Sequence, residues 1–278
     1  MRHIQERVTQ EPTLDRIAAA LERLSPPPAP EPDPSAPAFI WSEGQLQPVA
    51  RFKPLPIAQL SGIDAQRDAV LENSRRLAAG YAAHDILLWG ARGSGKSALV
   101  KSCIAALQGE GAALRLIEIA PDQMADLPRL FAHITDWPGA SVVFIDDLAF
   151  EGQDQSTRLL RSLLEGGANA RPARVRLYVT SNRRHIIARD MAEQAGAINP
   201  RDAIDDSLAL ADRFGLSLGF HVCDQDAYLA MVAGYAAAYG FAFEPAEALT
   251  WAAQRGARSG RVAWHYAVEC AGRLGLSI

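Results

Sequence analysis

Short apolar runs alternate with amphipathic segments from about residue 55 onward. Apolar runs of this length predict β-strands, and the segments between them have helical spacing. The expected strands are residues 86–89, 114–119, 142–145, 176–180 and 216–221. Alternation of this kind is typical of a parallel sheet that is covered by helices on both faces. We therefore expect an α/β core with five parallel strands, in residues 51–222.

The pattern changes beyond residue 226, where helical spacing continues without a convincing strand. Three segments, 227–239, 245–254 and 259–274, have the periodicity of helices. We assign residues 223–278 to a small all-helical lid domain that follows the core.

The N-terminal segment has a different composition. Apolar residues at helical spacing predict a short amphipathic helix, with Thr13 as its cap: Leu14, Ile17, Leu21 and Leu24. The prolines of residues 25–38 exclude a helix there and favour an extended tether. We assign residues 1–24 to the helix and 25–50 to a Pro-rich linker. The helix is either a frayed tail or an element that docks on another subunit or partner.

Composition narrows the class of protein. The chain of 278 residues is 49% hydrophobic, yet its longest apolar runs fall far short of the roughly 20 residues that cross a bilayer. The N-terminus lacks the apolar stretch of a signal peptide, so we expect a cytoplasmic protein without a membrane span. Its net charge of −4 gives no global basic footprint but leaves a local nucleic-acid site open. Three widely separated cysteines argue against a disulfide framework or a zinc site.

The stretch GARGSGKS, residues 90–97, matches the phosphate-loop pattern G-x-x-x-x-G-K-S (Walker A). An apolar strand precedes it and a helical segment follows, which is the order that phosphate binding requires. In such a loop glycines turn backbone N–H groups toward the phosphates, Lys96 supplies a positive charge and Ser97 a hydroxyl for Mg²⁺. The expected nucleotide-contacting residues of this stretch are Gly90, Ala91, Arg92, Gly93, Ser94, Gly95, Lys96, Ser97 and Ala98.

A second interpretation overlaps the first. Gly93, Gly95 and Ala98 also match the dinucleotide pattern G-x-G-x-x-A, and Glu118 ends the second expected strand, near where a ribose-binding acid belongs. That fold gives no role to a Lys-Ser pair in the loop or to an aspartate pair after the third strand. We therefore favour the phosphate loop.

The aspartate pair follows the apolar run 142–145, at the end of a strand where open α/β sheets bind ligands. Asp146 is the expected magnesium carboxylate (Walker B), either directly or through water. Asp147 is a candidate for polarising the attacking water. Glu151 is the alternative, although an acid there is also typical of a helix N-terminus.

These motifs in this order resemble the AAA+ class of P-loop ATPases, and further segments match it. SGID resembles the motif in which backbone around Gly62 and Ile63 holds the adenine. LYVTSN ends in Asn182, which the resemblance assigns as the polar sensor beside the γ-phosphate. LADRFGL resembles the segment with the arginine finger, here Arg213, which reaches a neighbouring subunit. SGRVAW resembles the second sensor, with Arg261 on the lid.

Plainer roles remain open for these residues. Asn182 is also suited to cap a helix entered at Arg183, and Arg261 to the exposed first turn of a helix. Arg213 has Asp212 and Asp206 as potential intrachain ion-pair partners.

The basic pair Arg183 and Arg184 fits a nucleotide contact, a second finger or a solvated loop.

From about Phe52 to the C-terminus the chain is similar to a bacterial AAA+ family catalogued as domain of unknown function 815. The segments that carry this similarity are long: LLWGARGSGKSALVK, IDDLAFE, TSNRRHI, LADRFGLSLGFH and RSGRVAWHYA. The resemblance implies ATP binding and Mg²⁺-dependent hydrolysis in a homo-oligomer that uses the Arg213 face, but it implies no cellular task. We expect hydrolysis to switch or remodel a protein or nucleic-acid complex, the client. A nucleotide-dependent binding module with little hydrolysis is the alternative, because an aspartate replaces the usual glutamate at Asp147. A small-molecule kinase fits less well, and the absence of N-K-x-D argues against GTP.

Overall fold

The computed structural model of the chain describes residues 5–24, 32–149, 155–165, 171–182 and 211–278. Two compact units, Met1–Asp33 and Pro34–Ile278, are described separately. In the first unit, α1 (Gln5–Leu24) begins earlier than the sequence pattern predicts. Its apolar side chains are exposed: Leu14 by 62%, Ile17 by 50% and Leu21 by 59%.

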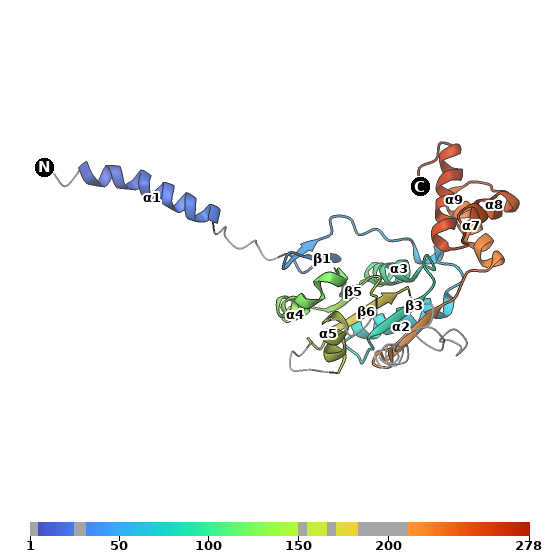
Figure 1. Ribbon diagram of the computed structural model, residues 1–278, viewed down its shortest axis with the longest axis horizontal. Helices are drawn as coiled ribbons and strands as arrows, with labels where there is room; N and C mark the ends of the chain where they lie inside the picture. The colour runs from blue at the N-terminus through green and yellow to red at the C-terminus, as the bar shows by residue number, and fades with distance from the viewer. Residues whose placement is uncertain (1–4, 25–31, 150–154, 166–170, 183–210) are drawn as a thin grey trace, which may run out of the picture. The chain divides into compact units, whose positions relative to one another are not determined.

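A seven-stranded sheet forms the centre of the second unit, in the order β2-β1-β4-β5-β6-β3-β7 (Figure 1). The strands are β1 (Ala38–Ser42), β2 (Gln45–Pro48), β3 (Ile86–Gly90), β4 (Leu114–Ile119), β5 (Ala140–Ile145), β6 (Val175–Ser181) and β7 (Leu216–Phe220). The five strands from β3 to β7 are those that the sequence predicts, and each pairs in parallel with its neighbours. The parallel α/β core is therefore confirmed.

The strand count differs from the expected five, because residues 38–48 form β1 and β2 rather than linker. β1 pairs in parallel with β4, and a turn at Glu43 and Gly44, both with positive φ, returns the chain as antiparallel β2. Phe39 and Trp41 are buried on the face that packs against α4 (Leu127–Ile134). In β1, backbone N–H and C=O groups form hydrogen bonds with β4, whereas those of a solvated tether would bind water. The composition of the segment does not predict this pairing with a distant strand.

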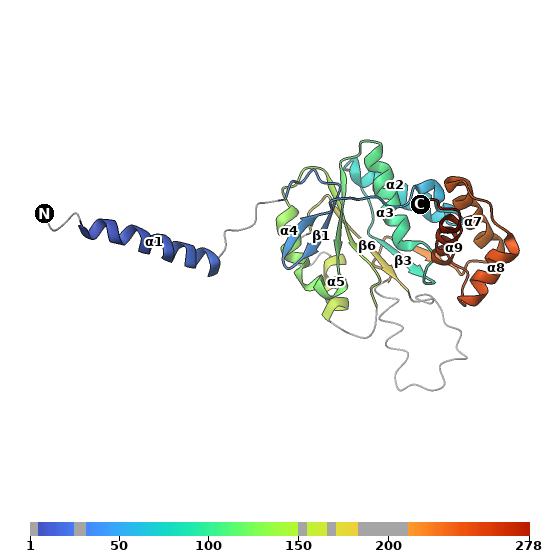
Figure 2. The same cartoon turned by 90° about the horizontal axis from the view of Figure 1, so that it is seen from above.

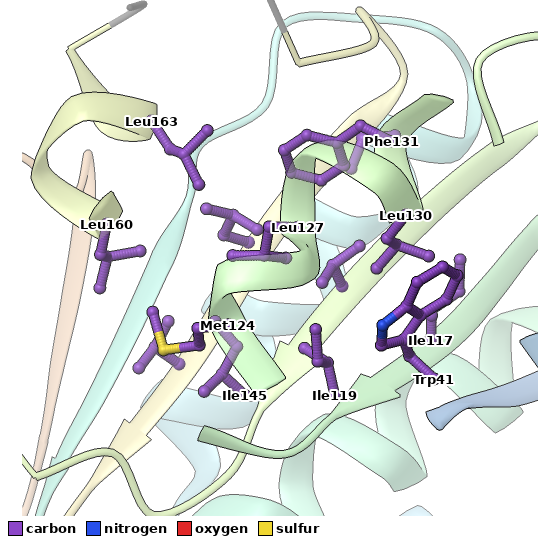
Figure 3. Packing of buried hydrophobic residues seen from close by; sticks show 14 of the residues in the cluster. Trp41, Ile117, Ile119, Met124, Leu127, Leu130, Phe131, Ile145, Leu160 and Leu163 are labelled. Atoms are coloured by element: carbon purple, nitrogen blue, oxygen red, sulfur yellow. The ribbon is translucent and has the colours of Figure 1, made fainter. Parts of the chain in front are cut away.

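Helices cover both faces of the sheet (Figure 2). α2 (Asp64–Ala78) and α3 (Lys96–Gly109) bury Val70, Leu77 and Leu99 on one face, whereas α4 and α5 (Gln155–Leu164) pack on the other. Two 3-10 segments, η1 (Ile57–Gln59) and η2 (Pro121–Asp126), complete the connections. Figure 3 shows η2, α4, α5 and the strands contributing to one cluster: Trp41, Ile117, Ile119, Met124, Leu127, Leu130, Phe131, Ile145, Leu160 and Leu163. Within the described ranges, none of the helices has the length and apolar character to cross a bilayer.

The C-terminal segment forms three helices, α7 (Gln225–Tyr239), α8 (Pro245–Gln254) and α9 (Gly260–Arg273), with a small buried cluster of their own. Their bounds lie within two residues of those that the sequence predicts. Asp224 caps α7 by accepting from the Ala227 N–H at 2.8 Å, and Ser259 caps α9 by accepting from the Val262 N–H at 3.3 Å. The caps fix where α7 and α9 begin, and the beginning of α9 lies against the phosphate loop.

Candidate nucleotide-binding site

The segment between β3 and α3 has the backbone of a phosphate loop. Gly90, Gly93 and Gly95 have positive φ values of 131°, 73° and 93°, which residues with a side chain rarely adopt. A Cβ on Gly90 would also lie 2.1 Å from the Phe220 carbonyl oxygen of β7. Glycine at this position is therefore required both by the backbone conformation and by the close approach of β7.

Lys96 is the first residue of α3, and its side chain is directed back over the loop. Nζ donates to the carbonyl oxygens of Gly90 at 3.0 Å and Ala91 at 2.8 Å, and to Asn182 Oδ1 at 3.1 Å. Only 5% of the residue is exposed. Burial lowers the pKa of Lys96, and the charges of Asp147 and Asp146 oppose this shift. The ammonium group thus lies at the centre of the site. Its three acceptors are neutral oxygen atoms, and the negative charges near it are those of Asp146 and Asp147.

Asp146 follows β5 and receives two hydroxyl groups. Ser97 Oγ and Thr180 Oγ1 each donate to Asp146 Oδ1 at 2.6 Å. A hydroxyl and a carboxylate in contact are hard oxygen ligands of the kind that Mg²⁺ takes together with phosphate oxygens and water. The residues present therefore fit a magnesium ion. Thr180 is not among the residues that the sequence predicts for the site, because a threonine near the end of a strand has no distinctive signal.

Asp147 is held in a left-handed conformation, with φ of 57°. Its N–H donates to Thr180 Oγ1 at 2.8 Å, and its carboxylate accepts from Asn182 Nδ2. A second cation, Arg92 of the phosphate loop, lies 3.8 Å from Asp147 Oδ2. Asn182 thus connects the lysine and the aspartate, with its amide oxygen on one and its amide nitrogen on the other. This arrangement can orient a water molecule near a bound phosphate.

The cavity over the loop has a volume of about 490 Å³, within the range of small-molecule sites. Its walls come from the phosphate loop, the strand ends, the segment before α2, and the lid. Sequence reasoning did not include the lid residues Met231, Tyr235 and Trp264, or Gln59 and Ser61 before α2. The aromatic lid residues had no signal in the sequence, because their spacing in α7 and α9 also suits a helical core.

The structure brings most of the predicted residues to this cavity. They are Ile63, Arg92, Gly93, Ser94, Gly95, Lys96, Ser97, Ala98, Asp146, Asp147, Asn182 and Arg261. Gly62, Gly90 and Ala91 lie beside it and do not line it, although the carbonyl oxygens of Gly90 and Ala91 hold Lys96.

Arg213 does not line the cavity and is paired with Glu165. Four residues of the sequence analysis lie outside the described part of the chain: Glu151, Arg183, Arg184 and Asp206.

The strand order excludes the dinucleotide interpretation. In that fold the second strand lies beside the first, whereas here β3 has β6 and β7 as its neighbours and β4 pairs with β1 and β5. Glu118 is not in the cavity and forms an ion pair with Lys101 at 2.8 Å.

The strand β3 leads into a phosphate loop, its neighbour β6 is followed by Asn182, and β5 is followed by the acid pair Asp146 and Asp147. Together with the three C-terminal helices, this arrangement is that of a AAA+ type P-loop ATPase fold. Residues 34–274 match the family described as protein of unknown function, DUF815. The chain belongs to this family.

Solved structures share the fold. The Orc1 protein of Aeropyrum pernix, solved in complex with DNA, is 15% identical, with a TM-score of 0.52 over 81% of this chain and 66% of that one. A mutant of the RuvB Holliday junction branch migration motor of Thermotoga maritima is 19% identical, with a TM-score of 0.50 over 77% of this chain. This chain spans 64% of that RuvB chain. No curated protein matches the sequence.

Proposed function

We propose that this chain is an ATPase that binds ATP with Mg²⁺ in the cavity between the α/β core and the helical lid. The observation that carries the proposal is the convergence of Lys96, Asp146, Asp147 and Asn182 on one phosphate loop, within hydrogen-bond distance of each other or of shared partners. Phosphoryl transfer needs positioning and stabilisation of charge more than covalent chemistry, and these groups supply both.

Ser97 and Asp146 would hold the magnesium ion, which would neutralise charge on the phosphate oxygens. Thr180 keeps Asp146 oriented, because its hydroxyl donates to the same oxygen as Ser97. Lys96 would exchange its carbonyl acceptors for phosphate oxygens. That exchange is favourable, because a buried ammonium group gains more from a charged acceptor than from a neutral carbonyl.

Asp147 and Asn182 would orient the attacking water. The Asp147 carboxylate accepts from Asn182 Nδ2, so both groups face the same region of the cavity. Arg261, in the first turn of α9, would contact the γ-phosphate from the lid. Loss of that phosphate would weaken the lid contact, so that hydrolysis changes the position of the lid.

Assembly into a homo-oligomer would complete the site. Arg213 of a neighbouring copy would stabilise negative charge on the γ-phosphate, as an arginine finger does in trans. The motion of the lid would then switch or remodel a protein or nucleic-acid complex, and α1 with its tether would recruit that client.

A second function, nucleotide-dependent binding with little hydrolysis, has one observation in its favour. The Asp147 carboxylate is already engaged by Asn182 and lies near Arg92, and its arm is shorter than that of a glutamate. Such a protein would respond to ATP binding rather than to turnover.

Replacement of Lys96 tests nucleotide binding. We expect Lys96→Ala to lose affinity for a fluorescent ATP analogue by at least tenfold, because the site loses its central cation. Lys101→Ala is the matched control, since Lys101 is on the same helix and pairs with Glu118 away from the cavity. If Lys96→Ala binds the ATP analogue with full affinity, the assignment of this cavity as an ATP-binding site is wrong. ATP binding without steady-state phosphate release would favour the second function.

A further inference from the structure

A second cavity, of about 580 Å³, lies on the other side of the phosphate loop. Three segments form its walls: the loop itself, the residues that follow β7, and the end of α8 with the turn into α9. Its lining includes Arg92, His221, Val222, Leu249, Ala252 and Arg258. The nucleotide cavity and the proposed ATPase mechanism make no use of this space.

The ionisable side chains of Arg, His, Asp or Glu type that line this second cavity, among the described residues, are all basic. Among the described residues that line it there is no aspartate or glutamate, whereas Arg92, His221 and Arg258 are basic. Arg258 is exposed, and within the described part of the chain it forms no ion pair. An arginine without a carboxylate, in a hollow that lacks acids, is suited to hold an anionic group from outside.

The remaining lining is apolar and aliphatic. Val222 is 66% exposed, and Leu249 and Ala252 form part of the wall behind it. No Trp, Tyr or Phe lies among the described lining residues, so a nucleobase has no ring to stack on. An inorganic anion would contact the arginines and leave the aliphatic wall unused. The combination fits a ligand that presents carboxylates and aliphatic groups together.

We propose that the second cavity is a docking site for a short acidic and aliphatic segment of a partner protein. A carboxylate of the segment pairs with Arg258, and its aliphatic side chains pack on Val222 and Leu249. Arg92, which also lies 3.8 Å from Asp147, adds positive charge to the same hollow. This interaction does not depend on ATP hydrolysis and is measured separately from it.

The test uses the full chain without nucleotide and a library of short random peptides displayed on phage. We expect the enriched sequences to alternate Asp or Glu with Leu, Ile or Val. A fluorescein-labelled enriched peptide, titrated by anisotropy, should bind Arg258→Glu at least tenfold more weakly, because attraction becomes repulsion. Arg255→Glu is the matched control: it is three residues away, stacks over the Trp251 ring at 3.3 Å and does not line the cavity. Its affinity should match that of the unmodified chain.

A second variant protects the test against misfolding of the first. Val222→Glu places a negative charge on an exposed side chain at the mouth and should also abolish binding of the acidic peptide. The proposal is overturned if no peptide is enriched, if basic peptides are enriched, or if Arg258→Glu and Val222→Glu bind like the unmodified chain. Competition by millimolar inorganic phosphate alone would indicate a small-anion site instead. Binding of a short DNA duplex that Arg258→Glu abolishes would indicate nucleic acid.

Discussion

Arg213 is bound to Glu165 of the same chain, with Nε donating to Glu165 Oε1 at 2.6 Å. The pair is partly exposed, with 30% of the Arg213 side chain and 50% of the Glu165 side chain accessible. Exposed ion pairs contribute about 1 kcal/mol or less to stability. The ion pair with Glu165 is therefore a small part of the stability of the fold.

Replacement of Glu165 by glutamine should remove the charge of this one partner of Arg213 while keeping a side chain of similar size. If Arg213 acts on a neighbouring copy, Glu165→Gln should raise the steady-state ATPase rate at protein concentrations where assembly is incomplete. Arg213→Ala should lower turnover by up to about 10³-fold while ATP affinity is retained, because the finger acts on the transition state. The measurement is ATPase rate against protein concentration for the three proteins. A substantial rate that is independent of concentration and unaffected by Arg213→Ala would rule out the finger.

Replacement of Asp147 by asparagine separates binding from turnover. Asparagine tolerates the left-handed conformation of Asp147, so the backbone is preserved while the carboxylate is lost. We expect Asp147→Asn to bind ATP and to hydrolyse it about 10² to 10⁴ times more slowly, as for loss of a general base. Single-turnover phosphate release with excess enzyme measures this step. Unchanged turnover would move the role to another acid, with Glu151 as the next candidate.

Gly90 is expected to be intolerant of any side chain. A Cβ there meets the Phe220 carbonyl at 2.1 Å and requires a φ of 131°. Gly90→Ala should lower the free energy of unfolding by about 3 kcal/mol or more, because β7 must move away from β3. Gly109→Ala is the control: no atom lies within 4 Å of its Cβ, and it ends α3. It should be neutral or slightly stabilising, by up to about 1 kcal/mol. Urea unfolding measures both, and equal effects would contradict the assigned strain.

Tyr178 should make stability sensitive to alkaline pH. Its hydroxyl contacts Ser74 Oγ at 2.8 Å and accepts from Asn73 Nδ2 at 3.0 Å, and burial raises its pKa from 10.0 to about 12. Between these values the unfolded chain has lost the proton and the folded chain keeps it, so stability falls as pH rises from 10 toward 12. The full difference corresponds to about 3 kcal/mol.

Tyr178→Phe isolates this contribution from the other tyrosines. The free energy of unfolding of the unmodified chain minus that of Tyr178→Phe should be constant below pH 9 and should decrease above pH 10. Urea unfolding at several pH values gives the difference. A difference that is independent of pH would mean that Tyr178 ionises at its ordinary pKa.

The parallel core could be predicted because its central strands β3 and β5 are buried along almost their whole length and consist of nearly continuous apolar runs. β5 is buried at every position, and its run was recognised from residue 142 although the strand begins at Ala140. β1 and β2 were missed, because β1 depends on pairing with β4, where Phe39 lies opposite Ile117, and β2 depends on pairing with β1. Prolines up to Pro37 gave the whole segment the composition of a tether.

Site residues were predictable where a motif gives a residue type a specific chemical role at a specific position. Lys96, Ser97 and Asp146 are of this kind, and the structure brings all of them together. Thr180 was not predictable in the same way, since a threonine in a strand is ordinary. Its role depends on Asp146 and Asp147 of the neighbouring strand, which only the folded sheet brings within hydrogen-bond distance.

The phosphate loop is a wall between two cavities, and Arg92 and Ser94 line both of them. Ser94 Oγ donates to the Ala91 carbonyl at 2.8 Å, and that carbonyl also accepts from Lys96, so one carbonyl of the loop links a residue of both cavities to the lysine of the nucleotide cavity. Binding free energies are path-independent. If a ligand in one cavity changes the affinity of the other cavity for its ligand, the second ligand changes the affinity for the first by the same factor. If a partner segment in the second cavity shifts the loop, its binding changes how tightly ATP is retained, and ATP changes the affinity for the segment by the same factor.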